Sequence, residues 1–141
     1  MSKPEKIFVF GAGGHAKVVI DAIEREGLHV IAWVCDDAVE KHGTQVMRYE
    51  IVRGRDDLLA RKAESGTGVV AIGDNGDRMK VASWLVERGW RLAVVVHPAA
   101  ELGRDVEIGE GTVVMAGCVI NTGARVGHNV IVNTGISDKN G

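Results

Sequence analysis

Aliphatic residues recur at every sixth position over the last third of the chain. They are Leu102, Ile108, Val114, Ile120, Val126 and Val132. A period of six fits neither a helix, with its period of about 3.6, nor a plain strand, with its period of about 2, and it is typical of a hexapeptide β-helix. Each hexad would form one flat side with its aliphatic side chain directed inward. The repeat therefore predicts a stacked, three-sided coil.

Two further residue classes keep the same period. A small or apolar residue follows each aliphatic one by four positions, at Val106, Thr112, Cys118, Ala124, Val130 and Ile136. Glycine or asparagine comes directly after most of the aliphatic residues, at Gly103, Gly109, Asn121, Gly127 and Asn133. We expect this last set to supply left-handed backbone positions at or near the corners. In the left-handed form of the architecture three hexads close one coil, so the repeat would make two coils.

Before the repeat, strand-like and helix-like segments alternate. Strands are expected over 6–10, 30–35, 68–73 and 91–96, and helices up to Gly27 and over 55–65 and 77–89, with an irregular stretch after Asp37. This alternation favours a parallel sheet covered on both faces. We therefore expect a Rossmann-like α/β domain over 1–97, followed by a short left-handed β-helix over 98–141.

The first strand leads into a glycine-rich turn. The run Gly11-Ala12-Gly13-Gly14-His15-Ala16 fits G-x-G-x-x-A, and Asp36 lies at the end of the next strand. Glycines at such a turn let a phosphate approach a helix N-terminus, and a carboxylate at the next strand end can bind ribose hydroxyls. Nucleotide binding is the favoured interpretation. A turn that requires glycine for its backbone alone is the alternative.

A second turn, from Ile72 to Arg78, reads IGDNGDR and follows the third strand. Open α/β sheets bind ligands at this edge, so the turn is a candidate part of the same site. Asn75 or Asp77 could equally be a helix N-cap with no ligand role.

The composition excludes several classes of protein. Seventeen basic and nineteen acidic residues give a net charge of −2, which is too balanced for binding along a nucleic-acid backbone. The apolar run near the N-terminus is too short for a signal peptide or a membrane span, so a cytoplasmic location is expected. Cys35 and Cys118 lack metal-ligand spacing, which favours two buried, reduced thiols and no metal.

Taken together, GAGGHAKVV, the strand ending in Asp36 and Asp37, IGDN, His97-Pro98 and the hexads resemble the PglD/NeuD family of sugar acetyltransferases. The resemblance covers almost the whole chain. It implies that the first domain holds a nucleotide-linked amino sugar or a sialic-acid-type sugar. It further implies a β-helix that forms a homotrimer and binds acetyl-coenzyme A between coils, with a histidine as general base.

The resemblance assigns residues as well. The residues that would line the nucleotide-sugar pocket are Gly11, Gly13, Gly14 and His15. Asp36 and Asp37 would contact the base or ribose, and Gly73 and Asn75 would close the other side of the pocket. His15 could instead simply cap the first turn of the helix. His97, before Pro98, is interpreted as structural.

The chain departs from the family pattern near its end. Family members carry the catalytic histidine in the segment after VNTG, whereas here ISDKNG follows and the expected position of the base is Asn140, whose amide cannot accept a proton. Asp138 also stands where the repeat requires an aliphatic residue. His128 falls on a different side of the prism from Thr122, which would lie beneath the base. We therefore interpret His128 mainly as a solvated or interface side chain and only as a weak candidate for the base. The coils that would bind acetyl-coenzyme A are likewise expected to be missing from this chain.

Three functions remain open on this evidence. The first is an acetyltransferase of which this chain is the substrate-binding portion. The second is a non-catalytic module that holds a nucleotide sugar and packs against partner subunits. The third is an NAD-dependent oxidoreductase, which the glycine turn and Asp36 suggest but which the missing second mononucleotide-binding half argues against.

Overall fold

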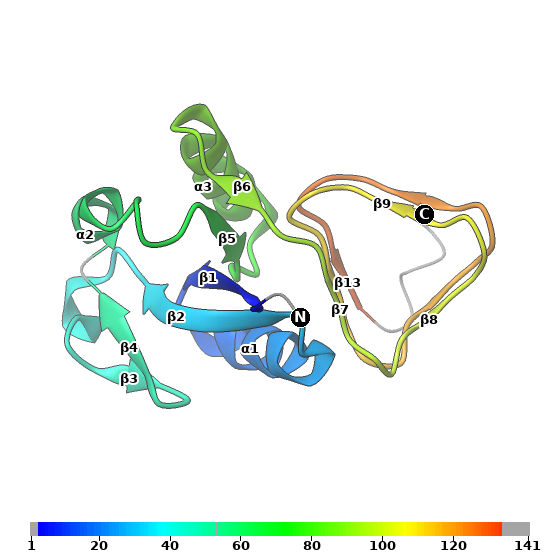
Figure 1. The fold of residues 1–141 in the computed structure, drawn as a ribbon, viewed down its shortest axis with the longest axis horizontal. Coiled ribbons are helices and arrows are strands. Elements are labelled where there is room, and N and C mark those ends of the chain that lie inside the picture. Colours follow the sequence, from blue (N-terminus) through cyan, green and yellow to red (C-terminus); the bar gives the residue numbers. More distant parts are fainter. Residues whose placement is uncertain (1–2, 53, 134–141) are drawn as a thin grey trace.

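The computed structural model describes residues 3–52 and 54–133. The α/β part contains a six-stranded sheet in the order β3-β4-β2-β1-β5-β6 (Figure 1). The strands are β1 (Glu5–Phe10), β2 (His29–Cys35), β3 (Gln45–Val46), β4 (Tyr49–Val52), β5 (Thr67–Val70) and β6 (Arg91–Leu92). All neighbouring strands are parallel except the antiparallel β3–β4 pair. The expected parallel sheet is confirmed.

Helices cover both faces of this sheet, as the alternation predicts. They are α1 (Gly14–Glu26), α2 (Gly54–Ala60) and α3 (Asn75–Glu87), with a short 3₁₀ turn η1 (Val39–Lys41). Ile7 and Val9 of β1 pack in one apolar cluster with α1, whereas Phe8 and Phe10 pack in another with residues of α2 and α3. Because successive side chains of a strand point to opposite faces, a strand buried on both sides must be apolar throughout.

The helix ends follow local chemistry. α1 ends at Gly27, whose φ of 76° is left-handed and whose N–H donates to Ile23 O at 3.2 Å, as the sequence predicts. The N-cap of α3 is Asp74, whose carboxylate accepts from the N–H of Asp77 at 2.9 Å. The suggestion that Asn75 or Asp77 is the cap is therefore wrong by one and three positions.

Two other expectations need correction. The stretch expected to be irregular contains η1, β3 and β4. The single strand expected over 91–96 is two strands in two sheets, because the N–H of Ala93 still donates to Gly68 O in the α/β sheet whereas that of Val95 donates to Thr112 O in the coil. The coil thus begins hydrogen bonding at β7 (Val95–Val96). A division into domains after residue 97 stays a prediction.

The hexads fold into a three-sided coil of short parallel strands (Figure 1). Its sides are the sheets β7-β10-β13, β8-β11 and β9-β12, built from β8 (Glu101–Leu102), β9 (Glu107–Ile108), β10 (Val113–Val114), β11 (Val119–Ile120), β12 (Arg125–Val126) and β13 (Ile131–Val132). Leu102 pairs with Ile120 and Ile108 with Val126, so each turn of the coil takes 18 residues. Three hexads to a turn are confirmed.

The aliphatic residues of the hexads line the inside of the coil, where Val114, Ile120, Val126 and Val132 are buried together with Cys118. The side that begins with β7 also faces outward onto the α/β part, because Val95 and Val113 belong to the apolar cluster of α1. One side of the coil is therefore an extension of the α/β core.

The corners do not lie where the sequence predicts. Left-handed residues recur three positions after each aliphatic one, at Asp105, Gly111, Gly117, Gly123 and Asn129. Gly103 and Gly109 have a different reason to be glycine. A Cβ atom would lie 2.4 Å from Thr122 N at Gly103 and 2.7 Å from the carbonyl carbon of Gly127 at Gly109. The backbone of the next turn of the coil leaves no room for a side chain there.

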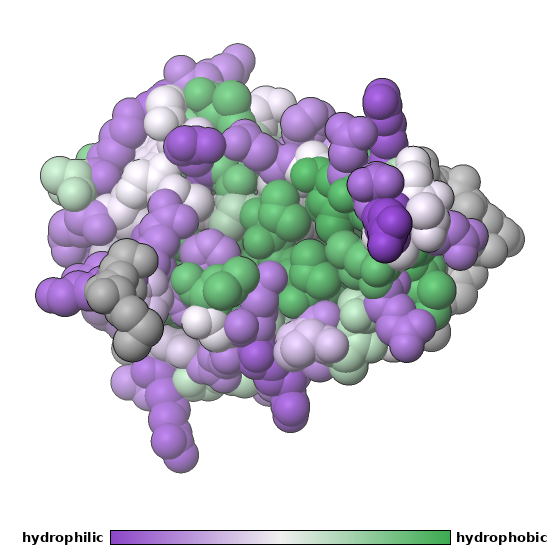
Figure 2. Space-filling model, turned by 45° about the vertical axis from the view of Figure 1, so that its right-hand side comes forward, coloured by the Kyte–Doolittle hydropathy of each residue, from purple (hydrophilic) through white to green (hydrophobic). Residues whose placement is uncertain are grey.

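The first turn of the coil is less covered than the second. Leu102 is 38% exposed, whereas Ile120, its partner in the next turn, is 1% exposed. Seen with the coil turned forward, apolar side chains gather in the middle of the molecular surface (Figure 2).

Within residues 3–52 and 54–133, the helices are too short or too polar to cross a membrane.

Candidate functional site

The glycine turn between β1 and α1 has one glycine fixed by packing and two that face open space. Gly11 has φ 121°, and a Cβ atom there would lie 2.7 Å from Ala71 O. At Gly13 and Gly14 a Cβ atom would meet no protein atom within 4 Å, and neither residue has a positive φ. Backbone strain therefore does not explain these two glycines. They leave the N-terminus of α1 open to the approach of an anionic group.

Asp36 fastens this turn to the end of β2. Its Oδ2 accepts from the N–H of Ala12 and its Oδ1 from the N–H of Ala38, each at 2.7 Å. A carboxylate has about four acceptor positions, so lone pairs remain for a ligand. The contact of Asp36 with a base or ribose stays a prediction, while its support of the turn is a role that the motif alone did not indicate.

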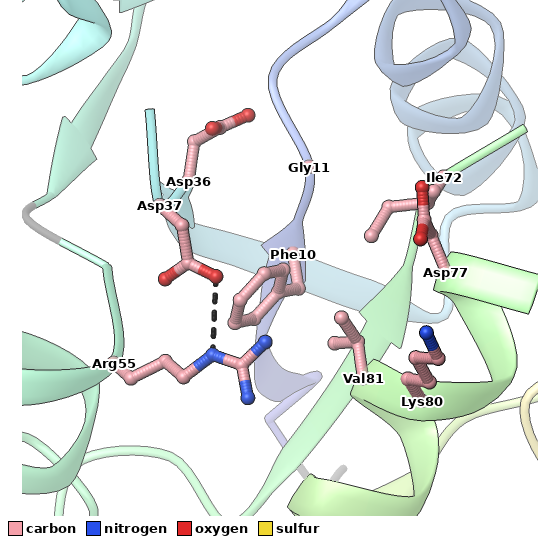
Figure 3. A pocket seen from close by; sticks show the side chains of 9 residues that line it. All are labelled: Phe10, Gly11, Asp36, Asp37, Arg55, Ile72, Asp77, Lys80 and Val81. Atoms are coloured by element: carbon pink, nitrogen blue, oxygen red, sulfur yellow. Dashed lines mark hydrogen bonds and ion pairs between the residues drawn. The ribbon is translucent and has the colours of Figure 1, made fainter. Parts of the chain in front are cut away.

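A cavity of about 280 Å³ opens at the carboxyl end of the sheet, on the side of α2 and α3 (Figure 3). Its wall is formed by Phe10, Gly11, Asp36, Asp37, Arg55, Ile72, Asp77, Lys80 and Val81. Ligands of open α/β sheets bind at this edge. The sequence identified Gly11, Asp36 and Asp37. It gave no reason to single out Arg55 or Lys80, which ordinary helix patterns place on a solvated face.

Asp37 and Arg55 form one wall of the cavity. Arg55 Nε lies 3.1 Å from Asp37 Oδ2, and its guanidinium lies 4.9 Å from the ring centre of Trp84. Gly54 has φ 67°, and a Cβ atom there would lie 2.8 Å from Asp37 Oδ1. α2 therefore starts with glycine beside the carboxylate.

The IGDN turn is organised by Arg78, which is 6% exposed. Its Nη1 donates to the carbonyls of Ile72 at 3.0 Å and Gly73 at 3.1 Å, its Nη2 donates to Asn75 Oδ1, and its Nε donates to Asn129 O of the coil at 2.7 Å. Asn75 thus has a structural partner. Arg78 ties the rim of the α/β site to a corner of the coil, a role that its position in a helical pattern does not reveal.

His15 lies between the two turns. A Cβ atom at Gly73 would be 4.0 Å from His15 Cβ, so the fold brings these two predicted residues together. Burial, with a smaller contribution from the charge of Arg78, lowers the pKa of His15. The lowered pKa favours the neutral imidazole, whose buried Nε2 is left without a hydrogen-bond partner among the described residues.

His128 lies apart from this site. It is exposed and lines a separate hollow of about 460 Å³ with Glu107, Ile108, Gly109, Arg125, Val126 and Gly127. His128 follows β12 and Thr122 follows β11, which belong to different sides of the coil. Its interpretation as a solvated or interface side chain stays a prediction. Asn140 and Asp138 lie outside the described residues.

The remaining candidates have local partners. His97 Nδ1 accepts from the N–H of Ala99 at 2.9 Å. Both cysteines are free and buried, as expected. Among the residues that the structure describes, no group of three or more histidine, cysteine, aspartate or glutamate side chains could hold a metal ion.

The fold and the site together define a class of two-part proteins. An α/β unit with a glycine turn and a polar cavity at the carboxyl edge of its sheet is followed by a three-sided coil of six-residue repeats. Residues 6–85 match the family model described as the PglD N-terminal domain. The chain belongs to the family of PglD-like sugar acetyltransferases.

Individual relatives agree with this family. The chain is 30% identical over 112 residues to UDP-N-acetylbacillosamine N-acetyltransferase of Bacillus subtilis, covering 79% of this chain and 52% of that protein. A mutant of perosamine N-acetyltransferase from Caulobacter crescentus, in complex with CoA and GDP-perosamine, aligns with a TM-score of 0.79 and 35% identity over 92% of this chain and 60% of its own. The acetyltransferase domain of PglB from Neisseria gonorrhoeae aligns with a TM-score of 0.77 and 32% identity, over 92% of this chain and 62% of its own. The chain thus spans only about half to three fifths of these relatives.

Proposed function

We propose that this chain is the nucleotide-sugar-binding part of an N-acetyltransferase that moves an acetyl group from acetyl-coenzyme A to an amine of a nucleotide-linked sugar. The observation that carries the proposal is the open glycine turn at Gly13 and Gly14 beside a polar cavity of about 280 Å³. The diphosphate would bind at the turn, where the N-terminus of α1 favours anions. The relatives, which include CoA and GDP-perosamine complexes, support this reading.

The coil is the second part of the chain. We take it to be a left-handed β-helix that assembles as a homotrimer. Acetyl-coenzyme A would bring the acetyl thioester. A cytoplasmic location also stays a prediction.

Two glycines with equal local freedom test the pocket. Gly13 and Gly66 both have open space around a Cβ atom and neither has a positive φ, but Gly66 precedes β5 at the opposite edge of the sheet. In Gly13→Glu a carboxylate would stand where the diphosphate binds. We expect calorimetric binding of nucleoside diphosphates to weaken by at least about tenfold, as for a like charge placed at close range. Gly66→Glu should bind as the unchanged protein does.

Release of free coenzyme A, followed with a thiol reagent, separates catalysis from binding. The chain would be mixed with acetyl-coenzyme A and a nucleotide-linked amino sugar. Thiol release that requires both substrates would support the acetyltransferase. Binding of the nucleotide without thiol release is expected both of a part that only binds the sugar nucleotide and of the non-catalytic module, and no binding of any nucleoside diphosphate would contradict both.

A further inference from the structure

The wall formed by Asp37 and Arg55 has charges that the acetyl transfer does not need. Asp37 is a second carboxylate at the end of β2, and it differs from Asp36 in its partners. Both oxygens of Asp36 already accept backbone N–H groups, whereas Asp37 points to the guanidinium of Arg55 (Figure 3). Both carboxylates line the cavity, and Asp37 is the one whose partner is another side chain of the cavity wall.

Several contacts hold this pair in place. The guanidinium of Arg55 lies 4.9 Å from the ring centre of Trp84 and 5.6 Å from that of Phe10, so aromatic rings fix its plane. Its Nε is used on Asp37, and the end of the guanidinium extends toward the space between Phe10 and Val81 (Figure 3). The left-handed Gly54 allows the carboxylate to sit against the start of α2. The wall of the cavity thus presents the acceptor oxygens of Asp37 next to the donor nitrogens of Arg55.

The charge of the cavity decides which end of a nucleotide it can take. Among the described residues, the cavity is lined by three carboxylates (Asp36, Asp37 and Asp77) and two cations (Arg55 and Lys80), and this excess of negative charge disfavours a diphosphate there. The open N-terminus of α1 is the better place for the phosphates. The uncharged base then falls in the cavity, against the apolar surfaces of Phe10, Ile72 and Val81.

The four common bases differ in how well they match this wall. Guanine presents two donors, N1–H and the N2 amino group, which a carboxylate can accept together, and two acceptors, O6 and N7, which an arginine fork binds. Uracil has a single N3–H donor between two carbonyl oxygens, so one of these oxygens would face Asp37. Cytosine and adenine each offer only one amino group to a carboxylate. Guanine alone satisfies both charged side chains fully.

We propose that Asp37 and Arg55 select guanine, so that the substrate is a GDP-linked sugar; this inference rests on the proposed function. Titration calorimetry with GDP, UDP, CDP and ADP on the full chain tests it. GDP should bind at least about tenfold more tightly than the others, in line with the discrimination that one good bidentate pair provides. Equal or tighter binding of UDP, CDP or ADP would overturn the inference while leaving the proposed function intact. If none of the four binds, the proposed function fails first.

Two altered bases locate the contacts without changing the protein. IDP lacks the N2 amino group and should bind about fivefold or more weakly than GDP, because Asp37 loses one donor. The same comparison in Asp37→Asn should show a smaller penalty, because the amide keeps only one acceptor oxygen. 7-Deaza-GDP lacks N7, and its penalty should become smaller in Arg55→Lys, whose ammonium still donates to guanine but without the planar fork.

Arg61→Lys provides the matched control. Arg61 also stacks on a tryptophan, Trp33, at 5.3 Å, but it does not line the cavity. It should leave the binding of all these nucleotides unchanged. If Asp37→Asn weakened GDP, IDP and UDP by the same factor, its role would be general support of the pocket and the inference would be wrong. Melting temperatures of each variant show whether the fold is kept.

Discussion

The α/β unit and the coil reach their folds by different physical routes. In the α/β unit, strands such as the seven-residue β2 bury side chains on both faces, in two separate apolar clusters. In the coil, strands of two residues form one cluster inside, and backbone hydrogen bonds between turns hold the rest. The first region is stabilised mainly by packing against helices. The second depends on close stacking of one turn on the next, which makes it sensitive to small changes in backbone spacing.

Truncation of one buried isoleucine in each region tests this difference in packing most directly, and we expect it to have the largest effect on stability. Ile20 of α1 is 0% exposed inside the larger cluster, while Ile120 is 1% exposed but lies next to the partly open Leu102. We expect Ile20→Ala to lower the free energy of unfolding by about 4 kcal/mol and Ile120→Ala by about 2 kcal/mol, because the coil can relax toward its open end. Urea denaturation followed by tryptophan fluorescence would measure both. A larger loss for Ile120→Ala would show that the coil is packed as rigidly as the sheet.

Arg78 joins the two regions, so its loss should affect both. Arg78→Met removes donors from the carbonyls of Ile72, Gly73 and Asn129 and should cost about 2–3 kcal/mol, as expected for hydrogen bonds to a buried charged group. Hydrogen exchange should rise at the coil corner near Asn129 as well as at the IGDN turn. If exchange rose at only one of the two, Arg78 would be a local cap and not a joint.

The same variant has an electrostatic readout. The charge of Arg78 contributes to lowering the pKa of His15, after burial. In Arg78→Met this contribution is lost, so the pKa of His15 measured by NMR should rise toward its ordinary value while staying below it. Because the lowered pKa means that the folded chain binds this proton less readily than the unfolded chain, His15 contributes stability that is present above pH 6.5 and is lost as the pH falls. The loss of stability at acid pH should therefore be smaller in the variant.

Two glycines of the coil test separately the close spacing of its turns and the left-handed backbone at its corners. Gly103→Ala would put a Cβ atom 2.4 Å from Thr122 N, whereas Gly123 has φ 79° and open space around it. We expect Gly103→Ala to cost about 2 kcal/mol through displaced backbone and Gly123→Ala about 1 kcal/mol through backbone strain alone. Thermal denaturation compares them. A reversed order would mean that corner conformation limits the coil more than the spacing of its turns.

Cys35 should affect stability only at alkaline pH. Burial, followed by the charges of Asp37 and Asp36, raises the pKa of this thiol from 9.0 to about 12. The unfolded chain therefore loses this proton first, and the stability that Cys35 contributes is complete below pH 9 and is lost as the pH rises toward 12. Cys35→Ser should lessen the decline in stability between these limits. Alkylation of Cys35 in the folded chain should be slow at pH 8.

The sequence by itself determined what depends on local period. The six-residue repeat predicts three hexads to a turn, and the alternation before it predicts a parallel sheet with covered faces. Both follow from which side chains must be buried at which spacing. The glycine turn likewise placed Gly13 and Gly14 at an open helix N-terminus, because residue type and neighbouring elements suffice for that inference.

Only the tertiary structure decided how distant segments share their hydrogen bonds. Val95 reads like a continuation of the strand before it, yet its N–H bonds to Thr112 in the coil. Arg78 reads like a solvated helix residue, yet its partners come from the turn before α3 and from Asn129. Asp36 and Asp37 are adjacent and chemically identical, and the fold gives one to the backbone and the other to Arg55. A pattern in one segment states what must be buried, but the partner of a polar group is set by whichever segment folds against it.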